Sequence, residues 1–169
     1  MTIPKSAFAL ASAFVLAAAV PAMATTPPTP KAAAAAKALT GTWQLVRYEN
    51  TMPDGKVVMP FGAKPKGYFT YDPTGHLSIH IMRTPPVVPF AAGNAKGTDA
   101  EVRNAYESYA GYFGTWRIND DATAVVHIVE GALRPDYTGT DQFRPFTLNG
   151  DTLIVRPSPS EYRELRRVR

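Results

Sequence analysis

The chain has no cysteine and only three histidines among its 169 residues. The missing thiols exclude disulfide bonds, thiolate metal sites and cysteine nucleophiles, so the fold has to rest on its apolar core. The histidines are His76, His80 and His127. His76 and His80 would share one face of a strand but lie about 13 Å apart, which is too far to bind one metal ion together. We therefore predict no metal site.

The sequence also lacks the short motifs of common catalytic and nucleotide-binding sites. It contains no G-x-S-x-G, H-E-x-x-H, P-loop or G-x-G-x-x-G pattern. Glu130 follows His127 by three residues, so in a strand the two side chains would face opposite sides and form no acid-base pair. We predict no cofactor and no catalytic residues, and we favour a role other than that of an enzyme.

The excess of positive over negative charge is small as well. The formal net charge is +4 at pH 7. The first 24 residues carry one lysine and no acid, so their removal lowers this charge by one, to +3. A charge this small and dispersed does not indicate nucleic-acid binding, and we expect no nucleic-acid partner.

The longest apolar run lies close to the N-terminus. It spans residues 8–20, about 13 residues, whereas a helix that crosses a bilayer needs roughly 20. Lys5 precedes it, and Ala22-Met23-Ala24 follows as an A-x-A cleavage pattern. These features predict a signal peptide over 1–24, cleaved after Ala24, a periplasmic or secreted location, and no membrane span in the mature chain.

The residues after the signal divide into a linker and one domain. Residues 25–40 are rich in proline and alanine, which predicts a linker that runs into a short helix near 32–39. Residues 41–169 have the length of a single domain.

Turn signals recur at strand spacing through this domain. Pro53-Asp54-Gly55 and Asn149-Gly150-Asp151 are two of them, and they separate runs rich in β-branched and aromatic residues. The predicted strands are 41–49, 56–60, 67–72, 76–82, 112–118, 123–130, 140–148, 152–156 and 162–168. Eight or nine antiparallel strands indicate an all-β fold, either a closed barrel or a sandwich.

One segment has helical character instead. Thr98 and Glu101 form a capping box, apolar residues follow at helical spacing as far as Tyr109, and Gly111 is a stop signal. The loop over 83–97 has the length of a lid, a binding loop or a disordered segment. The aromatic residues here either pack the helix on the barrel or form a lid over its mouth; they are Tyr106, Tyr109, Tyr112, Phe113 and Trp116.

Strand alternation places three polar residues on apolar faces. His127 alternates with valines, and Gln142 and Arg144 share a face with Phe146. Burying a guanidinium without a partner costs several kcal/mol, so Arg144 should meet an acid, a carbonyl or an anionic ligand group. The three residues, with tyrosines, form either a network that only fixes the fold or a cluster that recognises a ligand.

Several segments together resemble a known family. They are GTWQLV at 41–46, GYFTYDPTGHLS at 67–78, YAGYFGTW at 109–116 and GTDQFR at 139–144. In order and spacing they are similar to the bacterial and fungal lipocalin-like domain family, over residues 41–168. The resemblance implies a closed antiparallel lipocalin-like β-barrel of about 8–10 strands around a central cavity, with one inserted helix and a short N-terminal helix. It also implies that Trp43 lies low in the barrel, with Arg167 packed near it.

The expected function is binding of a small apolar or amphipathic molecule in the barrel cavity by an exported protein. The predicted ligand-binding residues are Trp43, Tyr71, Tyr109, Trp116, His127, Gln142 and Arg144. One alternative is a cofactor-free isomerase or cyclase that uses His127 as general base and Arg144 or Tyr71 to stabilise an enolate-like charge. The other alternative is a structural envelope protein with a filled barrel.

Overall fold

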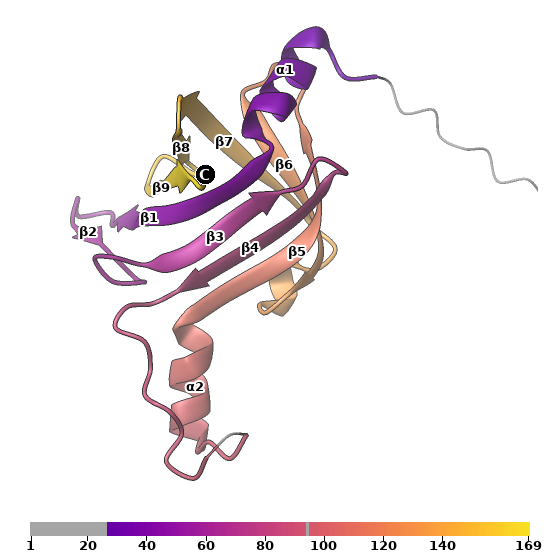
Figure 1. Cartoon of the computed structure of the whole chain (residues 1–169). Helices are drawn as coiled ribbons and strands as arrows, with labels where there is room; N and C mark the ends of the chain where they lie inside the picture. The colour runs from indigo at the N-terminus through magenta and orange to yellow at the C-terminus, as the bar shows by residue number, and fades with distance from the viewer. Residues whose placement is uncertain (1–26, 94) are drawn as a thin grey trace, which may run out of the picture.

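The computed structural model describes residues 27–93 and 95–169, so the predicted signal peptide over 1–24 lies outside the described residues. The described strands are β1 (Gly41–Thr51), β2 (Val57–Val58), β3 (Lys66–Tyr71), β4 (His76–Met82), β5 (Tyr109–Ile118), β6 (Ala124–Ala132), β7 (Asp141–Asn149), β8 (Thr152–Val155) and β9 (Glu161–Arg167). They form one antiparallel sheet in the order β2-β1-β3-β4-β5-β6-β7-β8-β9 (Figure 1). Pairing of β1 with β9 closes the eight strands β1 and β3–β9 into a barrel. The short strand β2 pairs with the last two residues of β1. The predicted closed lipocalin-like barrel is confirmed.

The strands form where the sequence alternates between apolar and polar residues. In β4, Leu77, Ile79 and Ile81 are buried in the barrel, while His76 and His80, which alternate with them, are exposed on its outer face. All nine predicted strands are present, with ends within three residues of the predicted ones. Turn residues between runs of β-branched and aromatic residues were therefore sufficient to place the strands.

The helix α1 (Pro30–Leu39) closes one end of the barrel (Figure 1). Thr29 caps its N-terminus by accepting a hydrogen bond from the backbone N–H of Ala32, and Leu39 is fully buried against the barrel core. The carbonyl of Leu39 has no partner within the helix, and it accepts a hydrogen bond from Nε1 of Trp43 at 2.8 Å. The short helix predicted for this segment is confirmed. We call the end of the barrel that α1 covers the closed end.

A second donor reaches the same helix end from the last strand. The guanidinium of Arg167 donates to the carbonyl oxygens of Thr40 at 2.9 Å and Ala38 at 2.5 Å. It also lies 4.1 Å above the ring of Trp43, which confirms the predicted Trp43–Arg167 packing. The C-terminal end of α1 is thus held by hydrogen bonds from both β1 and β9.

The core fills the part of the barrel next to α1. Its largest fully buried side chains include those of Trp43, Tyr71, Leu153, Leu165 and His127. Each large apolar side chain buried in this way stabilises the fold by about 1.5–3 kcal/mol. Because this half of the barrel is filled, a ligand inside the barrel would have to lie toward the other end.

The helix α2 (Asp99–Glu107) extends from the end of the barrel opposite α1 (Figure 1). The predicted capping box of Thr98 and Glu101 is present. The helix is shorter than predicted, because Tyr109 and Gly111 belong to β5. No residue of α2 is buried. Neither helix in the described part of the chain has the length and apolar character needed to cross a bilayer.

Candidate ligand-binding site

A cavity opens at the end of the barrel opposite α1, which we call the open end. Its volume is about 80 Å³, counted as the space open to the centre of a water molecule. One water molecule needs about 10–15 Å³ of such space, so the cavity has room for several. Its apolar wall consists of Phe61, Phe69, Ile79, Ile81, Ala110, Gly111, Ala132, Val155 and Pro157, and its polar wall of Tyr48, Tyr112, Arg134, Tyr137, Arg144, Glu161 and Arg163.

The cavity wall carries an excess of positive charge. It contains three guanidinium groups, those of Arg134, Arg144 and Arg163, and one carboxylate, that of Glu161. This carboxylate is already paired, because one of its oxygens lies 2.7 Å from Nη2 of Arg163. Three positive charges against one negative charge favour anions in a space with low-dielectric walls.

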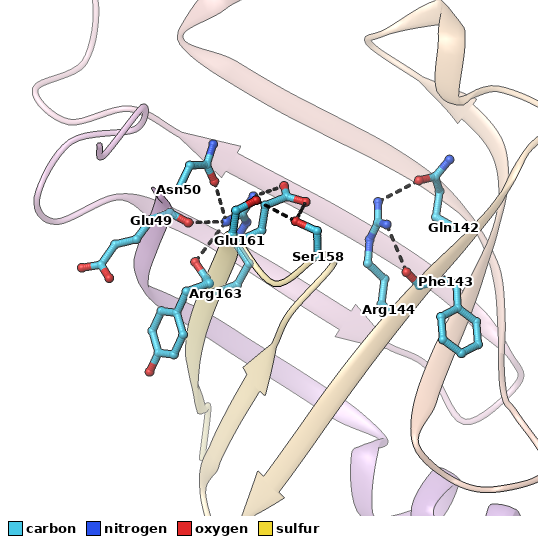
Figure 2. Close-up of polar contacts among 10 residues, drawn as sticks. Glu49, Asn50, Gln142, Phe143, Arg144, Ser158, Glu161 and Arg163 are labelled. Carbon is cyan, nitrogen blue, oxygen red and sulfur yellow. Dashed lines mark hydrogen bonds and ion pairs between the residues drawn. The ribbon is translucent and has the colours of Figure 1, made fainter. Parts of the chain in front are cut away.

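Arg163 is a structural group of this wall. Its side chain is only 4% exposed, and burial lowers the pKa of its guanidinium. The guanidinium lies 3.2 Å above the ring of Tyr48. Figure 2 shows its other partners; it donates to the carbonyl oxygens of Glu49 and Tyr162, to Oδ1 of Asn50 and to Glu161. Because its donors are used within the protein, Arg163 contributes charge to the cavity rather than free hydrogen bonds.

Arg144 has much weaker partners. It donates to the side-chain oxygen of Gln142 at 2.9 Å and to the carbonyl oxygen of Phe143 at 3.3 Å (Figure 2). Within residues 27–93 and 95–169, no carboxylate lies within 4.0 Å of it. Two neutral acceptors leave the charge of a half-buried guanidinium uncompensated and several of its five N–H groups available. Arg144 is therefore a half-buried guanidinium of the cavity with free capacity for a ligand, whereas Arg134, the other arginine of the wall without a carboxylate partner among the described residues, is exposed.

His127 lies beneath the cavity, between two tyrosines. Its Nε2 is 3.0 Å from the hydroxyl of Tyr71, and its Nδ1 is 2.8 Å from the hydroxyl of Tyr112. The imidazole is fully buried, which lowers the pKa of His127 to about 3, and the charge of Arg144 acts in the same direction. His127 is therefore neutral at pH 7, with both ring nitrogens hydrogen-bonded.

Burial has the opposite effect on the two phenols. It raises the pKa of Tyr71 well above its usual range. It raises the pKa of Tyr112 to about 12, although the positive charge of Arg144 and a close side-chain contact with Arg144 oppose the shift. Both hydroxyls therefore keep their protons at pH 7. Only Tyr112 reaches the cavity wall; Tyr71 lies among the filled core residues.

The structure brings four of the seven predicted ligand-binding residues together. Tyr71 and His127 form the buried pair described above, and Gln142 and Arg144 extend along β7. The predicted inward orientation of His127, Gln142 and Arg144 is confirmed. Of the seven residues, however, only Arg144 lines the cavity.

The other three predicted residues lie elsewhere. Trp43 is fully buried at the closed end, and Trp116 is also there, donating from Nε1 to the carbonyl oxygen of Asp72 at 3.1 Å. Tyr109 is on the outer face of β5, where its hydroxyl lies 2.8 Å from Nδ1 of His80. Each of these three residues has a hydrogen-bond partner within the protein. That they contact a ligand stays a prediction.

The aromatic residues around α2 do not form a lid over the cavity. Tyr112 and Trp116 point into the barrel, while Phe113 and Tyr106 are exposed. Among the described residues, none from α2 or from the preceding loop lines the cavity. The lid alternative does not fit the structure, because β5 begins at Tyr109 and Tyr109, Tyr112, Phe113 and Trp116 are divided between the two faces of the barrel.

Most residues of the site, among them Arg163, Tyr48 and Phe61, were missed at the level of sequence. Arg163 shares a strand face with Leu165, so its inward orientation was readable from the alternation in β9. Tyr48 and Phe61 pack edge to face with ring centres 4.7 Å apart, and Phe61 comes from the connection after β2. No strand pattern covers Phe61, which explains why it was not predicted.

Comparison with known proteins addresses the family. The family model described as a lipocalin-like domain matches residues 40–166. No curated protein matches the chain. Among solved structures, a redesigned β-barrel has 15% sequence identity and a TM-score of 0.39, over 85% of this chain and 100% of that chain. The family match covers the whole barrel, from the start of β1 to within one residue of the end of β9. This chain belongs to the lipocalin-like domain family.

Proposed function

We propose that this protein binds a small amphipathic molecule in the cavity at the open end of the barrel. The observation that carries the proposal is the two-sided wall of this cavity, apolar at Phe61, Phe69 and Ile81 and polar at Arg144 and Tyr112. Such a wall is typical of small-molecule sites, in which apolar contacts supply area and a few polar groups fix orientation.

The size of the cavity limits the ligand. The filled closed end, with Trp43 and Leu165 fully buried, leaves no room for a long chain along the barrel axis. The ligand would therefore be compact, with its polar group beside Arg144 and its hydrocarbon part against the apolar wall.

Straight-chain 1-alkanols from butanol to octanol test the proposal without assuming a charged head group. We expect binding that strengthens about fourfold for each added CH₂ group until the cavity is filled. In ¹H–¹⁵N NMR spectra, the titration should shift signals of Ala110, Gly111 and Ala132, which line the cavity.

A pair of variants shows whether the cavity is the site. Ala132→Phe places a large side chain in the cavity wall, and Leu133→Phe adds a ring at the next residue, which is exposed. We expect Ala132→Phe to weaken octanol binding at least tenfold and Leu133→Phe to leave it within twofold. Absence of binding by every alkanol, or equal binding by both variants, would refute the proposal.

The isomerase alternative has less support. A general base has to reach its substrate, and His127 does not line the cavity. Burial lowers the pKa of His127 to about 3, so its imidazole is a weak base. The wall still contains Tyr112 and Arg144, so catalysis by this protein would have to use these groups instead.

Export forms the second part of the proposal, and the N-terminal sequence supports it. Lys5, the apolar run over 8–20 and the triplet Ala22-Met23-Ala24 follow the order of a secretory signal. The mature protein would then meet its ligand outside the cytoplasm. Intact-mass analysis of the protein from the periplasm or medium should find a chain that begins at Thr25; a cytoplasmic chain that begins at Met1 would contradict export.

A further inference from the structure

The polar wall of the cavity has more hydrogen-bond donors than acceptors, because three of its groups are guanidiniums and only one is a carboxylate. Arg144 has only donors, and its partners are two neutral oxygens. The one carboxylate in the wall, that of Glu161, already accepts from Arg163 and from the hydroxyl of Ser158. A head group that complements this wall therefore needs acceptors and negative charge.

The buried pair beneath the cavity decides what Tyr112 offers. Neutral His127 has one N–H and one bare nitrogen, so it donates to one tyrosine and accepts from the other. The tyrosine that accepts from His127 keeps a hydroxyl proton for another partner. The tyrosine that accepts from His127 should be the one whose own hydroxyl proton can find another hydrogen-bond acceptor.

Burial distinguishes the two possibilities. Tyr71 is 0% exposed, and its hydroxyl has His127 as its hydrogen-bond partner in the described part of the chain. A free proton on Tyr71 would be left unsatisfied in the filled core, which carries a penalty. A free proton on Tyr112 would point into the cavity, where water or a ligand can accept it. The favoured arrangement has Tyr71 donating to Nε2 and the Nδ1–H group donating to Tyr112.

From these contacts, and resting on the proposed function, we infer that the cavity selects carboxylates: Arg144 and the free hydroxyl of Tyr112 donate to the carboxylate oxygens, with Tyr71 and His127 as positioning residues that keep this hydroxyl turned outward. The apolar wall at Phe61, Phe69 and Ile81 then takes the hydrocarbon part of the acid.

Four six-carbon compounds with different head groups test the selection: hexanoate, hexanamide, 1-hexanol and hexylamine, titrated at pH 7. We expect hexanoate to bind at least tenfold more tightly than hexanamide or hexanol, because hydrogen bonds between charged groups are about twice as strong as neutral ones. Hexylamine should bind weakest. Equal affinity for hexanoate and hexanol would overturn the selection of carboxylates but leave the proposed function standing, whereas no binding by any of the four would refute the proposed function itself.

Two charge-removing variants test whether the guanidinium of Arg144 is required. Arg144→Gln should weaken hexanoate binding tenfold or more and leave hexanol within twofold. Arg117→Gln is the matched control, since Arg117 is an exposed arginine of β5 outside this cavity and its loss changes the net charge equally. Equal weakening of hexanoate by both variants would show general attraction to a basic protein and would overturn the role of Arg144.

The positioning role has a spectroscopic test that a merely structural role would not satisfy. In long-range ¹H–¹⁵N NMR of His127, we expect the proton on Nδ1 and a bare Nε2. Tyr112→Phe should then weaken hexanoate binding about three- to tenfold, with hexanol unchanged. A proton on Nε2, or unchanged hexanoate binding by Tyr112→Phe, would overturn the roles of Tyr112 and His127, and the Arg144 variants would still decide the selection of carboxylates.

Discussion

Arg167 at the closed end of the barrel and Arg144 at the open end both extend from strands, but their guanidinium groups have different partners. At the closed end, Arg167 stacks on Trp43 and donates to two backbone carbonyls of the α1 terminus. At the open end, Arg144 has a neutral amide oxygen and a carbonyl oxygen, beside a cavity. The first arrangement satisfies the protein's own groups, while the second leaves charge available. Substitutions at the closed end should therefore affect mainly stability, and substitutions at the open end should affect mainly ligand binding.

The largest effect should come from the closed end. Trp43→Ala removes the largest fully buried side chain, its hydrogen bond to Leu39 and the surface on which Arg167 stacks. We expect a loss of about 3–5 kcal/mol in the free energy of unfolding, measured by urea denaturation. Trp116→Ala is the control at the same end, since Trp116 is only partly buried; a cost as large as that of Trp43→Ala would contradict the central role of Trp43.

Acid should have the next largest effect, through His127. Its pKa is about 3 in the folded protein, below the value near 6.5 of an unfolded chain. The unfolded state therefore binds the proton first, and stability falls as the pH falls from about 6.5 toward 3. Between pH 7 and pH 4 this contributes a loss of about 3 kcal/mol.

The variant His127→Gln isolates this contribution. It keeps a donor and an acceptor but does not titrate, so its stability should depend less steeply on pH over the same range. Carboxylates titrate equally in both proteins and cancel in the difference. Parallel stability curves for the two proteins would show that His127 is not buried as a neutral group.

Replacing the arginine of the closed end should have a moderate effect. Arg167→Met keeps an apolar stem over Trp43 but leaves the carbonyls of Ala38 and Thr40 without their donor. We expect a loss of about 2 kcal/mol in the free energy of unfolding, with faster hydrogen exchange in α1. Unchanged exchange in α1 would show that the helix is held by its apolar contacts alone.

The same replacement at the open end should have the smallest effect. Arg144→Met removes an uncompensated charge near Arg163, which offsets its two lost hydrogen bonds. We expect the free energy of unfolding to change by less than about 0.5 kcal/mol. A loss as large as that of Arg167→Met would erase the distinction between the two ends and make Arg144 a structural residue.

The strands were predictable because their signals are local, whereas closure of the barrel was predicted from the family resemblance. Alternation in β4 and turn residues such as Asp54-Gly55 specify strands and their ends without reference to distant residues. The pairing of Trp43 with Arg167 is different, since it joins the first and last strands. It was predicted from the family resemblance and not from any pattern within either strand.

The site was less predictable because alternation gives the face of a residue and not its depth in the barrel. Trp43, His127 and Arg144 all face inward, yet only Arg144 reaches the cavity. Depth depends on the stagger between neighbouring strands, which a single strand does not encode. Tyr109 shows the second limit, since a helix that ends at Glu107 places it in β5 and on the outer face.

The seam between β1 and β9 has a consequence for how the protein is made. Arg167 and the backbone of Thr40 are 127 positions apart, so the barrel closes only after every other strand has been synthesised. Until then β1 and β8 are open edges that can pair with other chains. Substitutions in β9 should therefore reduce the yield of folded protein in a cell even where they change the free energy of unfolding of the folded molecule little.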